Sequence, residues 1–388
     1  MSSPPLHLLI SAEDSEIELV SELSQCFGLA RIVSVRSLLL KTAFEIVPGR
    51  RLPQLAFSRQ LLPSAKAIRC ESVRDWAAQL YQAVAGFLPD DKPWSLHIEP
   101  HYGARTISRM GARAWHSAGR AGHEQNRIQP LGQSAESVPR RISVDAGKNR
   151  CRLIRQNLIE LLERKRRHLL RKLRTTPMPF APEDSLVQLL LTAPETGFIS
   201  IAPAPMPFEQ HHLLSAFPKG EVAVASDKAA PSRAFAKLVE AELRLGSAIH
   251  RGETCVDLGA SPGSWTYVAV NRGARVLAVD RSALREDLMR NRQVEFQRGN
   301  AFSFQPQNTV DWLFCDVLAP AEITANLLLK WLRQRWCRRF VVTLKIKDSP
   351  RDETLAKLKR ELAPLTSEVF LTRLCANKKE VSAFGTAS

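Results

Sequence analysis

The sequence lacks any apolar run that approaches the roughly eighteen residues of a membrane span, so no transmembrane helix is expected. Its first residues carry no basic stretch ahead of the short apolar patch at Leu6–Ile10, and this arrangement does not fit a secretory signal. Hydrophobic residues make up 44% and charged residues 24% of the chain, which is ordinary for soluble globular protein. We therefore expect a cytoplasmic protein with no membrane partner.

The sequence also lacks any Cys-x-x-Cys pair. Its seven cysteines are an odd number and stand far apart, so reduced and mostly buried thiols are expected, and neither a disulfide framework nor a zinc knuckle. His211 and His212 are adjacent, which is poor geometry for two ligands of one metal, and we interpret them as a surface-loop pair. No metal site is predicted, and no metal is expected to be required.

Acidic residues are few relative to basic ones. Lysine and arginine number 55 against 39 for aspartate and glutamate, which gives a formal net charge of +16. This balance favours a polyanionic partner, and nucleic acid is favoured over a membrane surface because no basic segment has the amphipathic pattern of an anchor. The 388 residues suit two or three domains.

The first hundred residues alternate strand-like and helical patterns. Strands are expected at Leu6–Ile10, in the apolar run Val33–Leu40 and at Ser95–Ile98, and helices at Ser15–Phe27 and Val73–Phe87. This order predicts a small α+β module of ferredoxin type over residues 1–100.

Residues 101–148 have a different composition. From Gly103 to Ser143 the chain is rich in Gly, Arg, Ser, Gln and His, and five arginines are spaced along it: Arg105, Arg109, Arg113, Arg120 and Arg127. A segment this polar buries little, so we interpret it as a basic insertion. It is either a mobile loop that contacts RNA phosphates or a solvated insertion with no binding role.

Residues 149–220 are predicted to form an RNA-binding part. Asn149–Leu173 has leucines at helical spacing, and Ser185–Thr192 and Thr196–Ala202 are expected to be paired strands. The second half of the helix carries a run of cations: Arg164, Lys165, Arg166, Arg167, Arg171 and Lys172. These cations indicate phosphate contact, although a merely solvated face would have the same composition. The boundary to the next domain is placed between Gly220 and Lys228.

The C-terminal half begins with the pattern of a βαβ unit. Thr254–Leu258 is a buried strand, Gly259–Gly263 a sharp turn, Ser264–Asn271 the start of a helix, and Arg275–Val279 a second strand that ends in Asp280. Glycines let the backbone approach a ligand closely, and an acid at the end of the second strand can bind ribose hydroxyls. The sequence therefore predicts a nucleoside-binding α/β sheet.

The turn does not have the G-x-G-x-x-G spacing of dinucleotide-binding proteins. It contains Pro262 and only two glycines, Gly259 and Gly263, and therefore suits a ligand without a pyrophosphate. This favours S-adenosylmethionine as the cofactor and makes a nucleotide-dependent oxidoreductase an unfavourable alternative.

Polar residues follow the later strands of the same sheet. Asn300 comes after Val294–Gln297, Asp316 directly after Asp311–Cys315, and Lys345 directly after Arg339–Leu344. Because the carboxyl ends of parallel strands meet at one crevice, we expect Asp316 and Lys345 to lie close together. Lys237, from the helix before the first strand, and Glu380, from the last strand, can meet them there.

These motifs together resemble the FtsJ/RrmJ class of ribose 2′-O-methyltransferases, and within it the RlmM-type enzymes that methylate a cytidine of large-subunit ribosomal RNA. The matching segments are Ala230–Leu238, Val256–Tyr267, Val279–Asp280, Asp311–Asp316, Leu344–Lys345 and Glu380–Val381. Further upstream, the segments Phe57–Gln60 and Gly197–Ala202 are similar to the ferredoxin-like and THUMP modules of that family.

The resemblance implies an α/β fold, with a Rossmann-like class I methyltransferase domain over residues 229–388. It implies an α+β region before it, ferredoxin-like over 1–100 and THUMP-like over 149–220, and the basic stretch 101–148 looks like an insertion relative to the family. It also implies that Lys237, Asp316, Lys345 and Glu380 form a catalytic tetrad with Lys345 as the general base. An ammonium at Lys237 would lower the pKa of Lys345, whereas the two carboxylates would raise it.

The same resemblance implies which residues contact S-adenosylmethionine: Gly259, Ser261, Pro262, Gly263, Ser264, Trp265, Asp280, Asn300 and Asp316. Three positions depart from the family pattern. Asn300 stands in place of an aspartate near the adenine amino group, although an amide oxygen can accept the same hydrogen bond. Ala234 stands in place of a serine that contacts the cofactor, and Ser264 in place of a glycine.

The leading hypothesis is therefore an S-adenosylmethionine-dependent 2′-O-ribose methyltransferase that acts on RNA, and on large-subunit ribosomal RNA in particular. Transfer or messenger RNA is the alternative substrate. A catalytically inactive relative that binds RNA or assists ribosome assembly is the alternative class, and the intact tetrad disfavours it.

Overall fold

The computed structural model describes residues 6–27, 31–36, 39–43, 52–102, 144–346 and 351–388. The arginines predicted to lie in a basic insertion between Gly103 and Ser143 are outside these ranges. No helix within the described ranges combines the length and the apolar character that crossing a membrane requires.

The C-terminal half is built around one seven-stranded sheet with the order β11-β10-β9-β12-β13-β15-β14. The strands are β9 (Thr254–Leu258), β10 (Arg275–Asp280), β11 (Val294–Arg298), β12 (Val310–Cys315), β13 (Cys337–Lys345), β14 (Thr366–Thr372) and β15 (Glu380–Ala387). Strands β9 to β13 pair in parallel, whereas β15 runs antiparallel to both β13 and β14. The reversal of strand order lies between β9 and β12, where α/β sheets bind ligands at the carboxyl ends of their strands.

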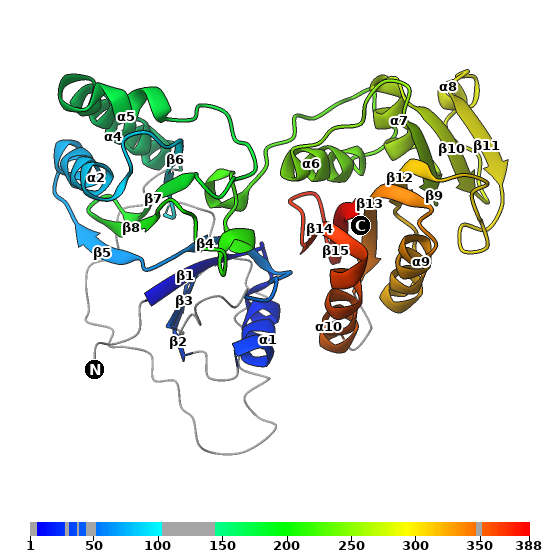
Figure 1. The fold of residues 1–388 in the computed structure, drawn as a ribbon, viewed down its shortest axis with the longest axis horizontal. Helices are drawn as coiled ribbons and strands as arrows, with labels where there is room; N and C mark the ends of the chain where they lie inside the picture. The colour runs from blue at the N-terminus through cyan, green and yellow to red at the C-terminus, as the bar shows by residue number, and fades with distance from the viewer. Residues whose placement is uncertain (1–5, 28–30, 37–38, 44–51, 103–143, 347–350) are drawn as a thin grey trace, which may run out of the picture.

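Helices cover both faces of this sheet (Figure 1). One face packs against α6 (Phe235–Leu245), α7 (Ser264–Asn271) and α8 (Glu286–Met289), and the other against α9 (Ala321–Arg333) and α10 (Arg351–Leu362), which is followed by the short helix η3 (Ala363–Leu365). Central strands such as β12 consist mostly of apolar residues because both of their faces are buried. The predicted α/β fold of this half is confirmed.

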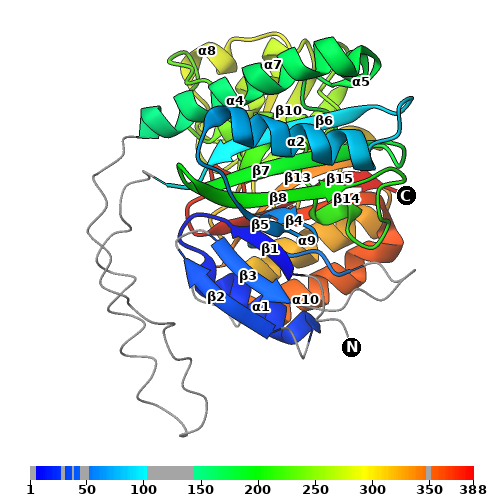
Figure 2. The ribbon, with the colours of Figure 1, turned by 90° about the vertical axis from the view of Figure 1, so that its left-hand side faces the viewer.

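The N-terminal half contains two four-stranded sheets. The first has the order β2-β3-β1-β4 and the second the order β5-β8-β7-β6. The first comprises β1 (Leu6–Ser11), β2 (Arg31–Arg36), β3 (Leu39–Ala43) and β4 (Ser58–Leu62), with α1 (Glu16–Phe27) between β1 and β2. The second comprises β5 (Lys66–Arg69), β6 (Trp94–Pro100), β7 (Ser185–Ala193) and β8 (Thr196–Ala202). Three helices belong with it: α2 (Val73–Phe87), α4 (Val144–Lys165) and α5 (Arg167–Lys172). Figure 2 shows α2 and α4 lying together over this second sheet.

Several expected elements differ in the structure. The run Val33–Leu40 is divided between β2 and β3, which pair with each other as antiparallel neighbours. The helix expected over Asn149–Leu173 begins earlier and is interrupted at Arg166, whose φ of −147° and ψ of 53° are not helical. The predicted pairing of Ser185–Thr192 with Thr196–Ala202 is confirmed by β7 and β8.

The strands of residues 1–100 are divided between two sheets, since β1 to β4 form the first sheet and β5 and β6 belong to the second. Strands β5 and β6 pair with β8 and β7, which come about a hundred residues later in the chain. Strand pairing of this kind depends on packing between distant segments and leaves no local signal in the sequence. His211 also differs from expectation: it begins the short helix η1 (His211–Leu213), and its Nε2 lies 2.8 Å from the carbonyl oxygen of Phe180.

The two halves lie side by side (Figure 1), and side chains of the N-terminal half contact the C-terminal half. Gln54 pairs through its side-chain amide with the backbone of edge strand β14, where its Oε1 accepts from the amide of Leu371 at 3.0 Å. Lys359 on α10 forms an ion pair with the buried Glu22 on α1. The connection between the halves passes through the short helix η2 (Pro218–Gly220), where Gly220 packs tightly against the backbone of Arg59.

Candidate active site

The turn after β9 leaves no room for side chains at its two glycines. Gly259 and Gly263 have φ values of 75° and 106°, a region that disfavours residues with a Cβ. A Cβ at Gly259 would lie 2.4 Å from Cγ1 of Val317, and one at Gly263 would lie 2.3 Å from Cδ1 of Leu288. The turn therefore brings backbone, and not side chains, to the carboxyl end of the sheet.

Asp280 lies next to this turn, at the end of β10. Its Oδ2 accepts from the amide of Ser261 at 3.0 Å and its Oδ1 from the amide of Ser282 at 2.8 Å. Each carboxylate oxygen has a further lone pair, so both can still accept hydrogen bonds from a diol. The sequence-predicted residues Ser261 and Asp280 are thus brought together, and the carbonyl of Pro262 accepts from the amide of Arg285 at 3.0 Å.

Ser264 and Trp265 are buried and contact the segment before α6. The hydroxyls of Ser264 and Ser232 lie 2.7 Å apart, and the indole nitrogen of Trp265 donates to the carbonyl of Ala234 at 2.8 Å. Their side chains hold α6 against the turn, so only their backbone remains to meet a cofactor. This arrangement gives a physical reason for a serine at position 264, since its hydroxyl has a partner in Ser232.

Asn300 follows β11 and lies at the same edge of the sheet as Asp280. Its Oδ1 accepts from the amide of Phe302 at 3.1 Å, which closes a turn of the kind that asparagine and aspartate both form. The oxygen keeps one lone pair, and the side-chain amide adds a donor that aspartate would lack.

Lys237, Asp316, Lys345 and Glu380 meet at the carboxyl ends of β12 and β13, as the sequence predicts. Nζ of Lys345 lies 2.7 Å from Oδ1 of Asp316 and 2.7 Å from Oε1 of Glu380. Nζ of Lys237 lies 3.0 Å from the other oxygen of Asp316 and 2.6 Å from the other oxygen of Glu380. The four groups form a closed ring in which ammonium and carboxylate alternate.

The two lysines of this ring differ in accessibility. The side chain of Lys237 is 8% exposed and that of Lys345 is 19% exposed. Lys237 comes from the buried face of α6, whereas Lys345 ends β13 at the crevice. Lys345 is therefore the amine that a substrate reaches more readily.

The sequence leaves open whether the pKa of Lys345 is raised or lowered, and these distances decide the direction. Burial by itself would lower the pKa of Lys345, but the carboxylates of Asp316 and Glu380 outweigh it and raise the pKa above its usual value. Burial would raise the pKa of Asp316, but the two ammonium groups hold it below its usual range. The ring is thus an assembly of charged groups, and Lys345 is an ammonium at neutral pH.

Sequence reasoning missed Asp257, which lies within β9 and is 2% exposed. Its Oδ2 accepts from both the amide of Thr266 at 3.0 Å and the hydroxyl of Thr266 at 2.7 Å, and so fixes α7 behind the glycine turn. Burial raises the pKa of Asp257 to about 7, although the hydrogen bonds from Thr266 favour the ionised form. An acid inside an otherwise apolar strand is the signal that could have revealed it.

Comparisons with known proteins agree with this geometry. Residues 230–370 match the model of the FtsJ-like methyltransferase family. The C-terminal domain is an FtsJ-like methyltransferase domain. Curated relatives include proteins named "Ribosomal RNA large subunit methyltransferase M" from Marinomonas sp., with 39% identity over 34% of this chain and 39% of that protein, and from Thauera aminoaromatica, with 34% identity over 44% of this chain and 50% of that protein.

The matched part thus spans half or less of the length of these relatives. Among solved structures, a methyltransferase of Burkholderia thailandensis with bound 1,6-didemethyltoxoflavin and S-adenosylhomocysteine matches at 17% identity over 40% of this chain and 79% of its own, with a TM-score of 0.30. A TM-score this low supports no conclusion about the methyltransferase domain.

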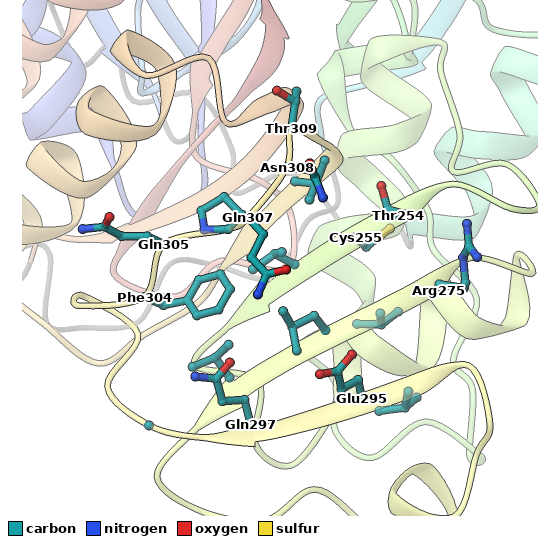
Figure 3. A pocket seen from close by; sticks show the side chains of 18 of the residues that line it. Thr254, Cys255, Arg275, Glu295, Gln297, Phe304, Gln305, Gln307, Asn308 and Thr309 are labelled. Carbon is teal, nitrogen blue, oxygen red and sulfur yellow. The ribbon is translucent and has the colours of Figure 1, made fainter.

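A hollow of about 770 Å³ opens on one face of β9, β10 and β11 in the methyltransferase domain (Figure 3). The connection from β11 to β12 over residues 299–309 runs in turns and bends, so this connection places no helix over the sheet. Polar side chains such as Gln297, Gln307 and Asn308 line the hollow. Its lining includes Asn300, one of the predicted cofactor residues, and none of the four residues of the charged ring.

Proposed function

We propose that the chain transfers a methyl group from S-adenosylmethionine to a ribose 2′-hydroxyl of RNA, with large-subunit ribosomal RNA as the substrate. The closed ring of Lys237, Asp316, Lys345 and Glu380 supports this proposal most directly. A lysine held between two carboxylates at the mouth of a nucleoside-binding crevice is suited to removing a proton from a hydroxyl group. The names of the curated relatives point to the same substrate.

The residues of the turn fit the proposed cofactor. Gly259 and Gly263 give the close backbone approach that a cofactor needs, Asp280 keeps lone pairs for ribose hydroxyls, and Asn300 can pair with an adenine amino group. When bound, the cofactor supplies an electrophilic methyl group on a sulfonium. The chain therefore has to align the 2′-oxygen and accept its proton.

Lys345 can accept that proton only in its neutral form. A neutral amine has two N–H bonds and one lone pair. With both N–H groups donating to Asp316 and Glu380 at 2.7 Å, the lone pair is the one position left for the 2′-hydroxyl. The carboxylates thus orient the base, and after transfer they stabilise the ammonium that forms.

Lys237 completes the orientation from the other side. Its ammonium lies on the second oxygen of each carboxylate and so keeps both carboxylates from turning away from Lys345. Because it is almost fully buried and both of its carboxylate contacts lie within the ring, Lys237 serves as the fixed cation and Lys345 as the group that exchanges a proton.

The N-terminal half is proposed to dock the RNA, with a ferredoxin-like module in residues 1–100 and a THUMP-like part in residues 149–220. The basic run at the end of α4 and on α5 supports this proposal because Arg164, Arg167, Arg171 and Lys172 are exposed to solvent. Arg166 forms an ion pair with Asp90, which makes its guanidinium less available for phosphate. Exposed cations on a helix are suited to phosphate contact.

Reversing two of these charges should weaken RNA binding without affecting chemistry. In the double variant Arg167→Glu, Arg171→Glu we expect KM for RNA to rise about tenfold at 150 mM salt, because two phosphate contacts are lost, and kcat to stay within about twofold. The matched control is Arg333→Glu, Arg338→Glu. Arg338 lies at the amino end of β13, the opposite edge from the tetrad, and Arg333 pairs with Glu361 on the neighbouring helix. An equal rise in KM in both variants would show that overall charge, and not α5, determines affinity.

Methyl transfer from labelled S-adenosylmethionine tests the proposed reaction. The full chain is incubated with unmodified ribosomal, transfer and messenger RNA in separate reactions, and the label is mapped after nuclease digestion. We expect the label in a 2′-O-methyl nucleoside of large-subunit ribosomal RNA. Label in a methylated base would contradict the assigned chemistry, and label only in another RNA would contradict the assigned substrate. RNA binding without transfer would favour an inactive RNA-binding protein.

A further inference from the structure

The segment of residues 373–379 connects β14 to β15 and ends next to Glu380 of the tetrad. The N-terminal half holds this segment at its start, where the amide of Arg373 donates to the carbonyl of Ala56 at 2.8 Å. Glu380 therefore begins β15 directly after a segment whose first residue is held by the N-terminal half.

The guanidinium of Arg373 makes a second link between the N-terminal half and the segment 373–379. Its Nη1 donates to the hydroxyl of Ser15 and lies 3.4 Å from the carbonyl oxygen of Asp14, both in the N-terminal half. Its Nη2 donates to the carbonyl of Lys378, two residues before Glu380. Because the guanidinium is planar and rigid, it sets the separation between Ser15 and the carbonyl of Lys378.

Contacts within the segment carry this restraint to Glu380. Asn377 is 7% exposed, and its side-chain amide donates to the carbonyl of Glu380 at 3.2 Å and to the hydroxyl of Ser382 at 3.0 Å. The amide of Cys375 donates to Oε2 of the buried Glu240 on α6 at 2.7 Å. The segment is thus anchored at its start, in its middle and at its end.

We propose that Arg373 is a positioning residue through which the N-terminal half sets the place of the Glu380 carboxylate against Lys345. This inference rests on the proposed function, because it assigns Arg373 a part in the same reaction. The N-terminal half then contributes to the catalytic centre itself as well as to RNA docking.

The proposal predicts a change in the acid–base behaviour of the tetrad. The charged groups that face Lys345 are Asp316, Glu380 and, on the far side of both, Lys237, while the buried Asp257 adds a more distant negative charge near Asp316 above its pKa of about 7. If Glu380 moves away, Lys345 loses one of its two nearest carboxylates, and its pKa falls toward the usual value. The amine then becomes neutral at lower pH but is less well oriented.

Arg373→Ala is compared with Gln54→Ala, which removes another contact between the halves but one made to β14 and not to the segment before Glu380. Single-turnover transfer is measured from pH 6.5 to 9.5 with the protein and the cofactor in saturating excess over RNA, and the Kd for RNA is measured separately by titration. In Arg373→Ala we expect the rate to fall about ten- to a hundredfold, the rising limb of the pH profile to shift to lower pH, and the Kd for RNA to be unchanged. Arg373→Lys should recover part of the rate, and Gln54→Ala should keep the wild-type profile.

Equal losses of rate in Arg373→Ala and Gln54→Ala with unshifted profiles would overturn the proposal, since Arg373 would then serve only to join the two halves. An unchanged rate in Arg373→Ala would overturn it as well. A second readout separates this result from a failure of the proposed function. The pH dependence of Lys345 acetylation by acetic anhydride, followed by peptide mass spectrometry, should shift to lower pH in Arg373→Ala even if the wild-type chain transfers no methyl group. No shift there contradicts the positioning role whatever the reaction.

Discussion

Lys345→Ala is expected to reduce methyl transfer by at least about a thousandfold while leaving cofactor and RNA binding intact. General-base catalysis contributes about a hundred- to ten-thousandfold, and in the proposed reaction Lys345 would also orient the nucleophile through its bonds to Asp316 and Glu380. Single-turnover transfer gives the rate, and isothermal titration gives the two binding constants. Lys330→Ala, an exposed lysine on α9, is the matched control and should behave as wild type.

Lys345→Arg separates the role of the base from the role of its charge. Arginine keeps a cation between the two carboxylates but does not lose its proton, so this variant should be as inactive as Lys345→Ala. Transfer by Lys345→Arg at more than about a tenth of the wild-type rate would show that the position supplies charge and not a proton acceptor.

The raised pKa of Lys345 also determines whether the rate of methyl transfer rises or falls with pH. In the proposed reaction the neutral amine is the active form, and the carboxylates keep the ammonium favoured at neutral pH. The single-turnover rate of the wild-type chain should therefore rise with pH, by about tenfold per unit below the pKa, until another step limits it.

The second large effect concerns stability, and Asp257 is expected to make the free energy of unfolding fall as pH rises from about 4 to about 7. The carboxyl has a pKa of about 7 in the folded chain, against 3.8 for a free side chain, so over this interval the folded state binds a proton that the unfolded state has released. Stability from this group is fully present below the unfolded pKa and is lost as pH rises to the folded one. Relative to Asp257→Asn, the wild-type chain should lose about 1.4 kcal/mol for each pH unit in that interval.

Urea unfolding of the wild type and of Asp257→Asn across this range measures the difference, in which the contributions of all other titrating groups cancel. Asp311→Asn is a close control. Its carboxylate accepts from the amide and hydroxyl of Thr254, as that of Asp257 does from Thr266, but its side chain is 21% exposed. The same measurement on Asp311→Asn compares the loss of a partly exposed acid with the loss of the buried one. A difference between wild type and Asp257→Asn that is constant with pH would contradict the burial argument.

Local sequence patterns were sufficient to predict the fold of the methyltransferase domain and the residues that meet at its sheet edge. Buried strands, the glycine turn and the polar residue after each strand are encoded within short segments, and parallel strands bring their carboxyl ends to one edge whatever the details of packing. Lys237, Asp316, Lys345 and Glu380 could therefore be named from the sequence and are found in contact.

The division of the N-terminal half could not be predicted in the same way. Strands β5 and β6 look like part of the first module because they are close to it in the chain, but they pair with β7 and β8 from beyond residue 184. The interruption at Arg166 likewise breaks a continuous helical pattern, and nothing in the spacing of its leucines indicates it. Both features depend on long-range packing, which local propensity does not report.

The sequence by itself thus determined the α/β class of the C-terminal domain, the identity of the tetrad and the residues of the glycine turn. Only the tertiary structure decided the charge state of Lys345, because that depends on distances of 2.7 Å to Asp316 and Glu380 outweighing the cost of burial. It also decided that Arg373 joins Ser15 to the carbonyl of Lys378, since contacts between residues more than three hundred positions apart, such as that of Arg373 with Ser15, arise only when the two halves pack together.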